Sequence, residues 1–144
     1  MKRTSLMRTL AAGVAVAVVL PATMARGSAG HSSSFPPQLV GRWTRTVTRA
    51  DVTREEANPT LDNSVCTFTV KAGGGAHIVC PRTPGAVFNG KVIPKGANHV
   101  QILFGDVNPN TYRWAVAGST LTLTKLEDPT PDRSAVLSGM WRRK

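Results

Sequence analysis

From Leu39 to the C-terminus, hydrophobic and polar residues alternate in short runs separated by turn-forming residues. This period-two pattern is typical of β-strands that have one buried face and one exposed face. The alternating runs lie at 43–48, 66–70, 76–80, 88–92, 100–104, 112–117 and 120–124. Seven or eight short strands with regular turns predict an all-β fold, either a sandwich or a barrel.

Two cysteines provide a test of these strands. Cys66 and Cys80 are symmetric about Gly73, in the middle of a Lys-Ala-Gly-Gly-Gly segment that is typical of a turn. A hairpin centred on Gly73 places the cysteines opposite each other, on the same face as Phe68 and Ile78. Cysteine spacing and hydrophobic alternation thus predict the same hairpin, and we expect a Cys66–Cys80 disulfide.

Two segments depart from the strand pattern and are candidates for short helices. Residues 49–63 are polar, and this connection could carry a helix around residues 53–57. The second candidate is 132–137, with Asp132 as its N-cap and Gly139 just past its end. The second helix would lie directly before the last strand.

The two ends of the predicted domain share the pattern L-x-G-x-W-x-R. Its residues are Leu39, Gly41, Trp43 and Arg45 in the first copy and Leu137, Gly139, Trp141 and Arg143 in the second. These copies form the first and last strands, which must pair if the sheet closes into a barrel. We therefore expect Trp43 and Trp141 on neighbouring strands, with the two arginines beside them.

A G-x-W near the start of the first strand, with an arginine near the end of the domain to pack on it, resembles the calycin superfamily. Lipocalins, fatty-acid-binding proteins, avidins and small bacterial protease inhibitors belong to that superfamily. The C-terminal stretch is also similar to small secreted bacterial lipocalin-like proteins, through Tyr112-x-Trp114, Gly118-x-x-Leu121-x-Leu123, Asp128, Arg133 and the closing L-x-G-x-W-x-R. The resemblance implies a small antiparallel up-and-down barrel of about eight strands over residues 39–144. It also implies that Trp43 closes the barrel floor and that Arg142 or Arg143 covers it.

Residues 1–29 have the organisation of a secretory signal peptide. Basic residues near the N-terminus precede a run of 12 small and apolar residues from Thr9 to Leu20, and Pro21 and further small residues follow. A membrane-spanning helix needs roughly 20 residues, so we expect cleavage and export without a stable membrane anchor. Residues 30–38 are polar and contain two prolines, and they are expected to form a flexible lead-in to the barrel domain.

Charge gives little indication of a partner. Without residues 1–29 the chain keeps 14 basic and eight acidic residues, so its net charge is +6 instead of +10. Apart from Arg142-Arg143-Lys144, the basic residues are scattered singly along the sequence. A solvated surface accounts for this distribution, and we expect no nucleic-acid partner.

No residues have the spacing of a catalytic or metal site. His31, His77 and His99 are far apart, and a disulfide would use both cysteines. None of the serines lies in a nucleophile elbow. The pairs Glu55-Glu56 and Asp128/Asp132 are expected to be solvated. The sequence thus predicts neither an enzyme nor a metal or cofactor site.

We expect a secreted binding protein that holds a small, mainly apolar ligand inside the barrel. The candidate lining residues share the face expected to point inward: Phe68, Ile78, Val100, Ile102, Phe104, Tyr112, Trp114 and Leu121. The alternative is a module that binds an extracellular protein, such as a protease inhibitor with a solid core, through residues 30–38 or 49–63. An accessible cavity favours the first function, whereas a filled interior with an exposed apolar patch favours the second.

The signal peptide generates a direct prediction. Small residues offer cleavage sites after Ala25 and after Ala29. N-terminal sequencing of protein recovered from the culture medium should therefore begin at Arg26 or Gly30. A secreted chain that still begins at Met1 would contradict the assignment.

Overall fold

The computed structural model describes residues 34–82, 87–105 and 110–144. The predicted signal peptide at 1–29 lies outside the described residues. The chain divides into units 1–31 and 32–144, and the elements below belong to the second unit. Within the described ranges, no helix is long and apolar enough to cross a membrane.

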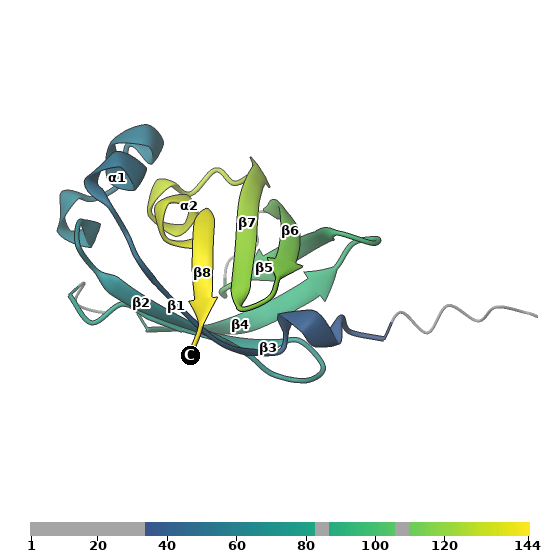
Figure 1. Ribbon diagram of the computed structural model, residues 1–144. Helices are drawn as coiled ribbons and strands as arrows, with labels where there is room; N and C mark the ends of the chain where they lie inside the picture. Colours follow the sequence, from purple (N-terminus) through teal and green to yellow (C-terminus); the bar gives the residue numbers. More distant parts are fainter. Residues whose placement is uncertain (1–33, 83–86, 106–109) are drawn as a thin grey trace, which may run out of the picture. The chain divides into compact units, whose positions relative to one another are not determined.

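Eight antiparallel strands form a closed up-and-down barrel, in which each strand pairs with the next (Figure 1). The strands are β1 (Gly41–Thr46), β2 (Val65–Val70), β3 (Gly75–Val79), β4 (Val87–Pro94), β5 (His99–Leu103), β6 (Thr111–Ala117), β7 (Thr120–Glu127) and β8 (Gly139–Arg143). Pairing of β8 with β1 closes the sheet, which removes the unpaired edges that an open sheet would expose. The predicted fold class, strand number and closure are confirmed.

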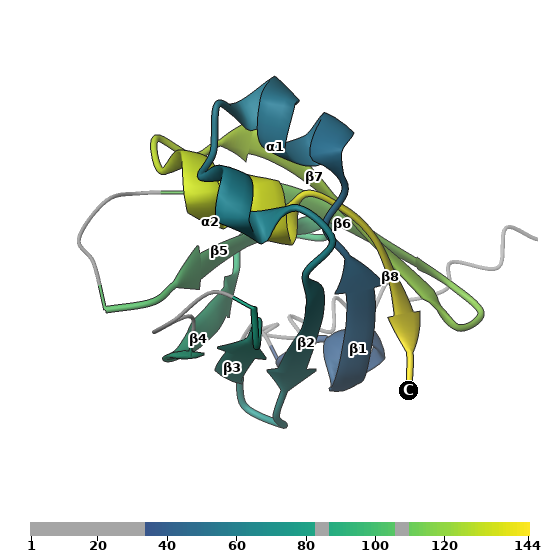
Figure 2. The same ribbon diagram turned by 90° about the vertical axis from the view of Figure 1, so that its left-hand side faces the viewer.

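Short helices lie at the two ends of the barrel. The 3-10 helix η1 (Pro37–Leu39) precedes β1, and α1 (Arg49–Glu55) and η2 (Pro59–Leu61) follow it. The last helix, α2 (Pro131–Leu137), connects β7 to β8. Figures 1 and 2 show α1 and α2 side by side at one end of the barrel, called the helix end below. At the opposite end, called the turn end, tight turns join β2 to β3, β4 to β5 and β6 to β7.

Three details of these helices differ from the sequence prediction. The first helix was expected around 53–57, but α1 begins at Arg49 because Thr48 and Asp51 form a capping box before it. Asp132 is not the N-cap of α2, since Thr130 occupies that position and Pro131 begins the first turn. No helix was expected in the lead-in at 30–38, and η1 begins within it at Pro37.

The predicted hairpin and disulfide are confirmed. Phe68 pairs with Ile78 across β2 and β3, and Val70 pairs with Ala76. Cys66 and Cys80 form a disulfide with their Cα atoms 4.3 Å apart, well inside the roughly 7 Å limit for a bridge. The bond ties the start of β2 to the segment that follows β3, at the helix end.

The two copies of the repeated motif pair with each other at the seam between β1 and β8. Trp43 lies opposite Arg143 in the strand register, as the closed barrel requires. Both tryptophans are completely buried. Each indole donates a hydrogen bond of 3.0 Å to the carbonyl four residues earlier, from Trp43 to Leu39 and from Trp141 to Leu137.

The arginine of each copy reaches into the other copy. Arg143 lies over the ring of Trp43, with its Cζ 4.3 Å from the ring centroid, and donates to the carbonyls of Gln38 and Val40 at 3.1 Å. Arg143, rather than Arg142, therefore covers this tryptophan. Arg45 lies 5.7 Å from the Trp141 centroid and donates to the carbonyl of Val136 at 3.0 Å and to that of Ser138. The seam thus consists of two reciprocal sets of contacts.

The glycines of the motif make room for these arginines. A Cβ atom at Gly41 would lie 2.8 Å from the Arg143 Nη1, and one at Gly139 would lie 2.8 Å from the Arg45 Cζ. Their φ angles of +151° and +132° are also ones that other residues rarely adopt. Every named position of the motif therefore has a structural role in closing the barrel.

We predict that Trp43→Ala and Trp141→Ala each lower the free energy of unfolding by about 3 to 5 kcal/mol, as truncation of a buried tryptophan does. The matched control is Met140→Ala, because Met140 lies next to Trp141 on β8 but is 70% exposed. Its effect should stay within about 0.5 kcal/mol. Urea unfolding measures all three, and a tryptophan variant as stable as the control would contradict the role of the seam.

Candidate functional site

The structure places six of the eight predicted lining residues in a packed core. Their exposed fractions are between 0 and 2%: Phe68, Ile78, Val100, Ile102, Tyr112 and Leu121. Side chains that lined an empty cavity of ligand size would keep accessible surface, whereas these are covered by one another and by the seam tryptophans. The interior is therefore filled at these positions. Phe104 and Trp114 are only partly buried against this core.

An aromatic pair at the helix end remains accessible. Phe88 pairs with Ile78 and so shares the inward face of β4, yet it is 46% exposed. Its ring centroid is 6.0 Å from that of Phe104, which follows β5. Gly90 makes this arrangement possible, because a Cβ there would collide with the Leu103 carbonyl and would lie 2.8 Å from the Phe104 ring. Phe104 was among the lining residues predicted from the sequence, whereas Phe88 was not.

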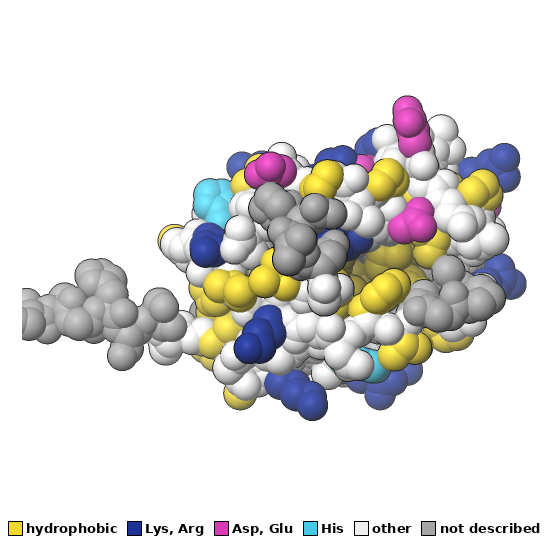
Figure 3. All heavy atoms as spheres, turned by 180° about the vertical axis from the view of Figure 1, so that it is seen from behind, with side chains coloured by type: hydrophobic (Ala, Val, Ile, Leu, Met, Phe, Trp, Pro, Cys, Tyr) yellow, Lys and Arg dark blue, Asp and Glu magenta, His cyan; other side chains and the backbone are white. Residues whose placement is uncertain are grey.

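Valine side chains extend this accessible apolar surface onto the outside of the barrel. Val87 precedes Phe88 on β4 and is 55% exposed, and Val65 at the start of β2 is 56% exposed. Val79 pairs with Val87 on the strand between them and is half-buried. We call Val65, Val79, Val87, Phe88 and Phe104 the apolar patch. Hydrophobic side chains are also visible between polar ones on the face drawn in Figure 3.

Asn110 supports β5, the strand that precedes Phe104. The described pairing of β5 with β6 is limited to His99 with Arg113 and Val100 with Tyr112. Beyond that point, the buried Asn110 side chain accepts from the Ile102 amide at 2.7 Å and donates to its carbonyl at 2.5 Å. The amide thus replaces a strand partner. This contact joins Asn110 to a residue eight positions earlier, and the alternation of the strands does not predict it.

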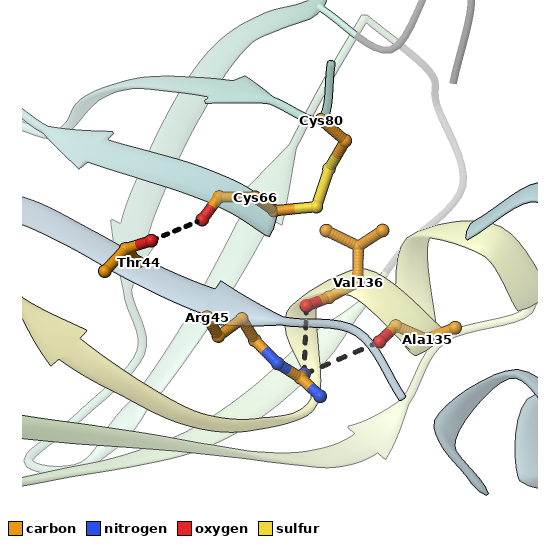
Figure 4. Close-up of a disulfide and its surroundings, with 6 residues drawn as sticks. All are labelled: Thr44, Arg45, Cys66, Cys80, Ala135 and Val136. Atoms are coloured by element: carbon orange, nitrogen blue, oxygen red, sulfur yellow. Dashed lines mark hydrogen bonds between the residues drawn. A yellow bond between two sulfur atoms is a disulfide. The ribbon is translucent and has the colours of Figure 1, made fainter. Parts of the chain in front are cut away.

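A network of buried charges holds the helix end together. Arg45 extends from β1 to the carbonyl oxygens of Ala135 and Val136 at the end of α2, near the disulfide (Figure 4). Its guanidinium also contacts Asp51 of α1 at 2.6 Å, and both side chains are at most 10% exposed. One buried cation therefore connects the seam to both helices.

Glu55 extends the network from α1 toward α2 and β7. It was expected to be solvated, but its side chain is only 5% exposed. It accepts hydrogen bonds from Ser134 at 2.7 Å, from Arg54 at 3.0 Å and from Lys125. The expectation was wrong because the fold brings Ser134 and Lys125, distant in sequence, next to this carboxylate.

Asp128 was also expected to be solvated, and its side chain is completely buried. Arg133 donates to it through Nε at 2.9 Å and Nη2 at 2.8 Å, and the Tyr112 hydroxyl donates to it as well. Burial, together with the Asp128 carboxylate, raises the pKa of Tyr112 far above its ordinary value. Tyr112 therefore stays protonated and donates a hydrogen bond between the core and the start of α2. Asp132 is exposed, as expected, and accepts from the Asn58 amide at 2.7 Å.

These buried charges are engaged with one another, which gives them a positioning role. Within the described ranges, no three histidine, cysteine, aspartate or glutamate side chains gather as they would around a metal ion. The apolar patch, by contrast, is accessible at the helix end through Val65, Val87 and Phe88. Comparison of the chain with protein-family models, curated proteins and solved structures returned no match.

Asp51 and Glu55 make stability depend on pH. Burial by itself raises the pKa of Asp51, but hydrogen bonds from Thr48 and the charge of Arg45 outweigh it and hold the pKa below its usual value. Burial of Glu55 is likewise outweighed, by hydrogen bonds from Lys125, Ser134 and Arg54. A carboxylate whose pKa is lowered by folding stabilises the fold above its unfolded pKa, and this stabilisation is lost as pH falls through the folded value.

We predict that stability is nearly constant above about pH 5 and falls below about pH 4 as these carboxylates become protonated. Asp51→Asn should lower the free energy of unfolding by about 3 to 5 kcal/mol at pH 7, because it leaves Arg45 buried without a counter-charge. The free energy of unfolding of this variant should also depend less on pH below about pH 4. The control is Asp62→Asn. The Asp62 carboxylate lies 4.0 Å from the guanidinium of Arg49, whose side chain is 87% exposed, and such a surface ion pair contributes at most about 1 kcal/mol. Urea unfolding from pH 3 to 7 tests this, and equal losses in the two variants would contradict it.

Proposed function

We propose that this domain is a secreted binding module that buries its apolar patch against an extracellular protein. The observation that carries the proposal is the combination of a core packed at six predicted lining positions with an aromatic pair at the helix end, in which Phe88 is exposed and Phe104 is partly buried. Exposed apolar side chains grouped at one end of a small domain are typical of interaction sites. Aromatic residues are enriched at such interfaces.

The scaffold around the apolar patch suits binding without rearrangement. The Cys66–Cys80 bridge follows Val65 directly, and Asn110 holds the strand that precedes Phe104. A surface that is already ordered loses less conformational entropy when a partner binds. The disulfide also suits an oxidising compartment, in agreement with export through the N-terminal signal.

A binding function is favoured over catalysis by the state of the ionisable groups. The buried charges Arg45, Asp51, Glu55 and Asp128 each contact a neighbouring side chain of opposite charge. Catalytic acids and bases need access to a substrate, and these ion pairs leave the buried groups without such access.

The second candidate is a small apolar ligand at the aromatic pair. Phe88 belongs to the inward face of β4 and is nevertheless 46% exposed, so a ring or short alkyl chain could pack on it at the edge of the barrel. Such a ligand would lie at the helix end and not among the six fully buried core residues.

A photo-crosslinker at position 88 distinguishes these functions. We replace Phe88 with p-benzoylphenylalanine, irradiate the producing culture and measure the mass of the secreted protein. A protein partner should add a mass of kilodaltons, whereas a small ligand should add a few hundred daltons. The control carries the same group at Arg113, which is exposed on β6 outside the apolar patch. Equal labelling at both positions, or none at position 88, would refute a role for the patch.

A further inference from the structure

Strand pairing brings together basic residues that are scattered in the sequence. Trp43, Val70, Val92 and Trp141 point inward, so their chain neighbours point outward: Arg42 on β1, Lys71 after β2, Lys91 on β4 and Arg142 on β8. Lys144 joins them, because its amide donates to the Arg42 carbonyl at 2.9 Å. All five side chains are exposed. We call the outer surface of β8, β1, β2, β3 and β4 that carries them the basic face.

The described outward positions of these five strands contain no acidic residue. The acidic side chains in the described part of the chain lie within 51–62 and 127–132, toward the helix end. In the view of Figure 3 the acidic side chains lie in the upper part, whereas basic side chains lie both there and along the lower edge. None of the five basic residues forms an ion pair with a described carboxylate. Their charges are therefore available to an external anion.

Polar side chains and a shallow depression lie between these charges. Thr69, His77 and Asn89 stand side by side on β2, β3 and β4, and the His77 Nδ1 is 2.7 Å from the Asn89 Oδ1. They line a depression of about 470 Å³ with Lys71 at its edge. Hydroxyl, imidazole and amide groups can form hydrogen bonds with phosphate oxygens, and the neighbouring lysines can neutralise the phosphate charge.

We propose that the basic face binds an extracellular phosphodiester polymer without bases, such as a polyol phosphate chain. The positive charges follow the curved outside of five adjacent strands, and a flexible chain can follow this curvature. A flat bilayer would touch only part of it. Single-stranded nucleic acid is disfavoured because the described outward positions of these strands carry no phenylalanine, tyrosine or tryptophan on which bases could stack. This site is separate from the apolar patch and does not depend on the function proposed for it.

Binding of a fluorescent synthetic poly(glycerol phosphate) oligomer to the purified protein, followed by anisotropy, tests the proposal. The affinity should fall on the order of tenfold or more between about 50 and 200 mM NaCl, because each neutralised phosphate contributes about 0.7 to the logarithmic salt slope. Absence of binding at the lower salt concentration would overturn the proposal.

The decisive variant is Lys71→Ala/Lys91→Ala. It should weaken binding on the order of tenfold and reduce the salt slope by about 1.4, for two lost phosphate contacts. The control Arg49→Ala/Arg113→Ala removes the same charge from exposed residues outside the basic face, on α1 and β6. It should leave the affinity within about twofold at moderate salt, where distant charges are screened. Equal losses in both variants would show that net charge alone is responsible and would overturn the site.

Two further probes test the choice of partner. Vesicles of phosphatidylglycerol and an oligothymidylate of matched charge are measured under the same conditions. Weaker binding of both than of the polyol phosphate is the expected result. Tighter binding of either would overturn the assignment to a base-free polymer. Phe88→Ser changes the apolar patch and leaves the basic face intact, so it should not alter polymer binding. Failure of this proposal can therefore be distinguished from failure of the protein-binding proposal.

Discussion

The structure depends on the exchange of arginines between the first and last strands. Arg143 covers Trp43 and binds carbonyls of the η1 segment at the turn end, whereas Arg45 contacts Trp141 and binds carbonyls of α2 at the helix end. Closure of the barrel and attachment of a helix at each end are therefore achieved by the same contacts. Because a guanidinium is planar and has five donors, one side chain can both lie over an indole and bind several carbonyls.

The arrangement of the helix end follows from the burial of Arg45. A buried cation is costly unless a counter-charge and hydrogen bonds surround it, and Asp51 supplies the counter-charge from α1. Asp51 also completes the capping box of α1, so one carboxylate both begins the helix and holds it against the seam. Glu55, one turn later, then meets Ser134 and Lys125. A segment that is polar in sequence is thereby ordered over the barrel.

Both proposed binding surfaces lie outside the packed part of the barrel core. Two seam tryptophans, Phe68 and Tyr112 occupy much of the interior of a domain of only about 110 residues. The described surface instead offers the apolar patch beside the disulfide and the basic face on strands β8 and β1 to β4. The two surfaces have different chemistry, so each is suited to its own partner.

The amino-acid sequence was sufficient to predict the features that depend on local periodicity and on pairs related by symmetry. Alternation predicted the strands, the position of Gly73 between Cys66 and Cys80 predicted the hairpin, and the repeated motif predicted closure between β1 and β8. The burial of Glu55 and Asp128, the contact of Asn110 with Ile102 and the gathering of Arg42, Lys71 and Lys91 on one face could not be predicted. Each depends on residues that are distant along the chain. Barrel closure, strand register and helix placement decide which of these residues become neighbours in space. The pattern of residues within one strand contains no information about such contacts.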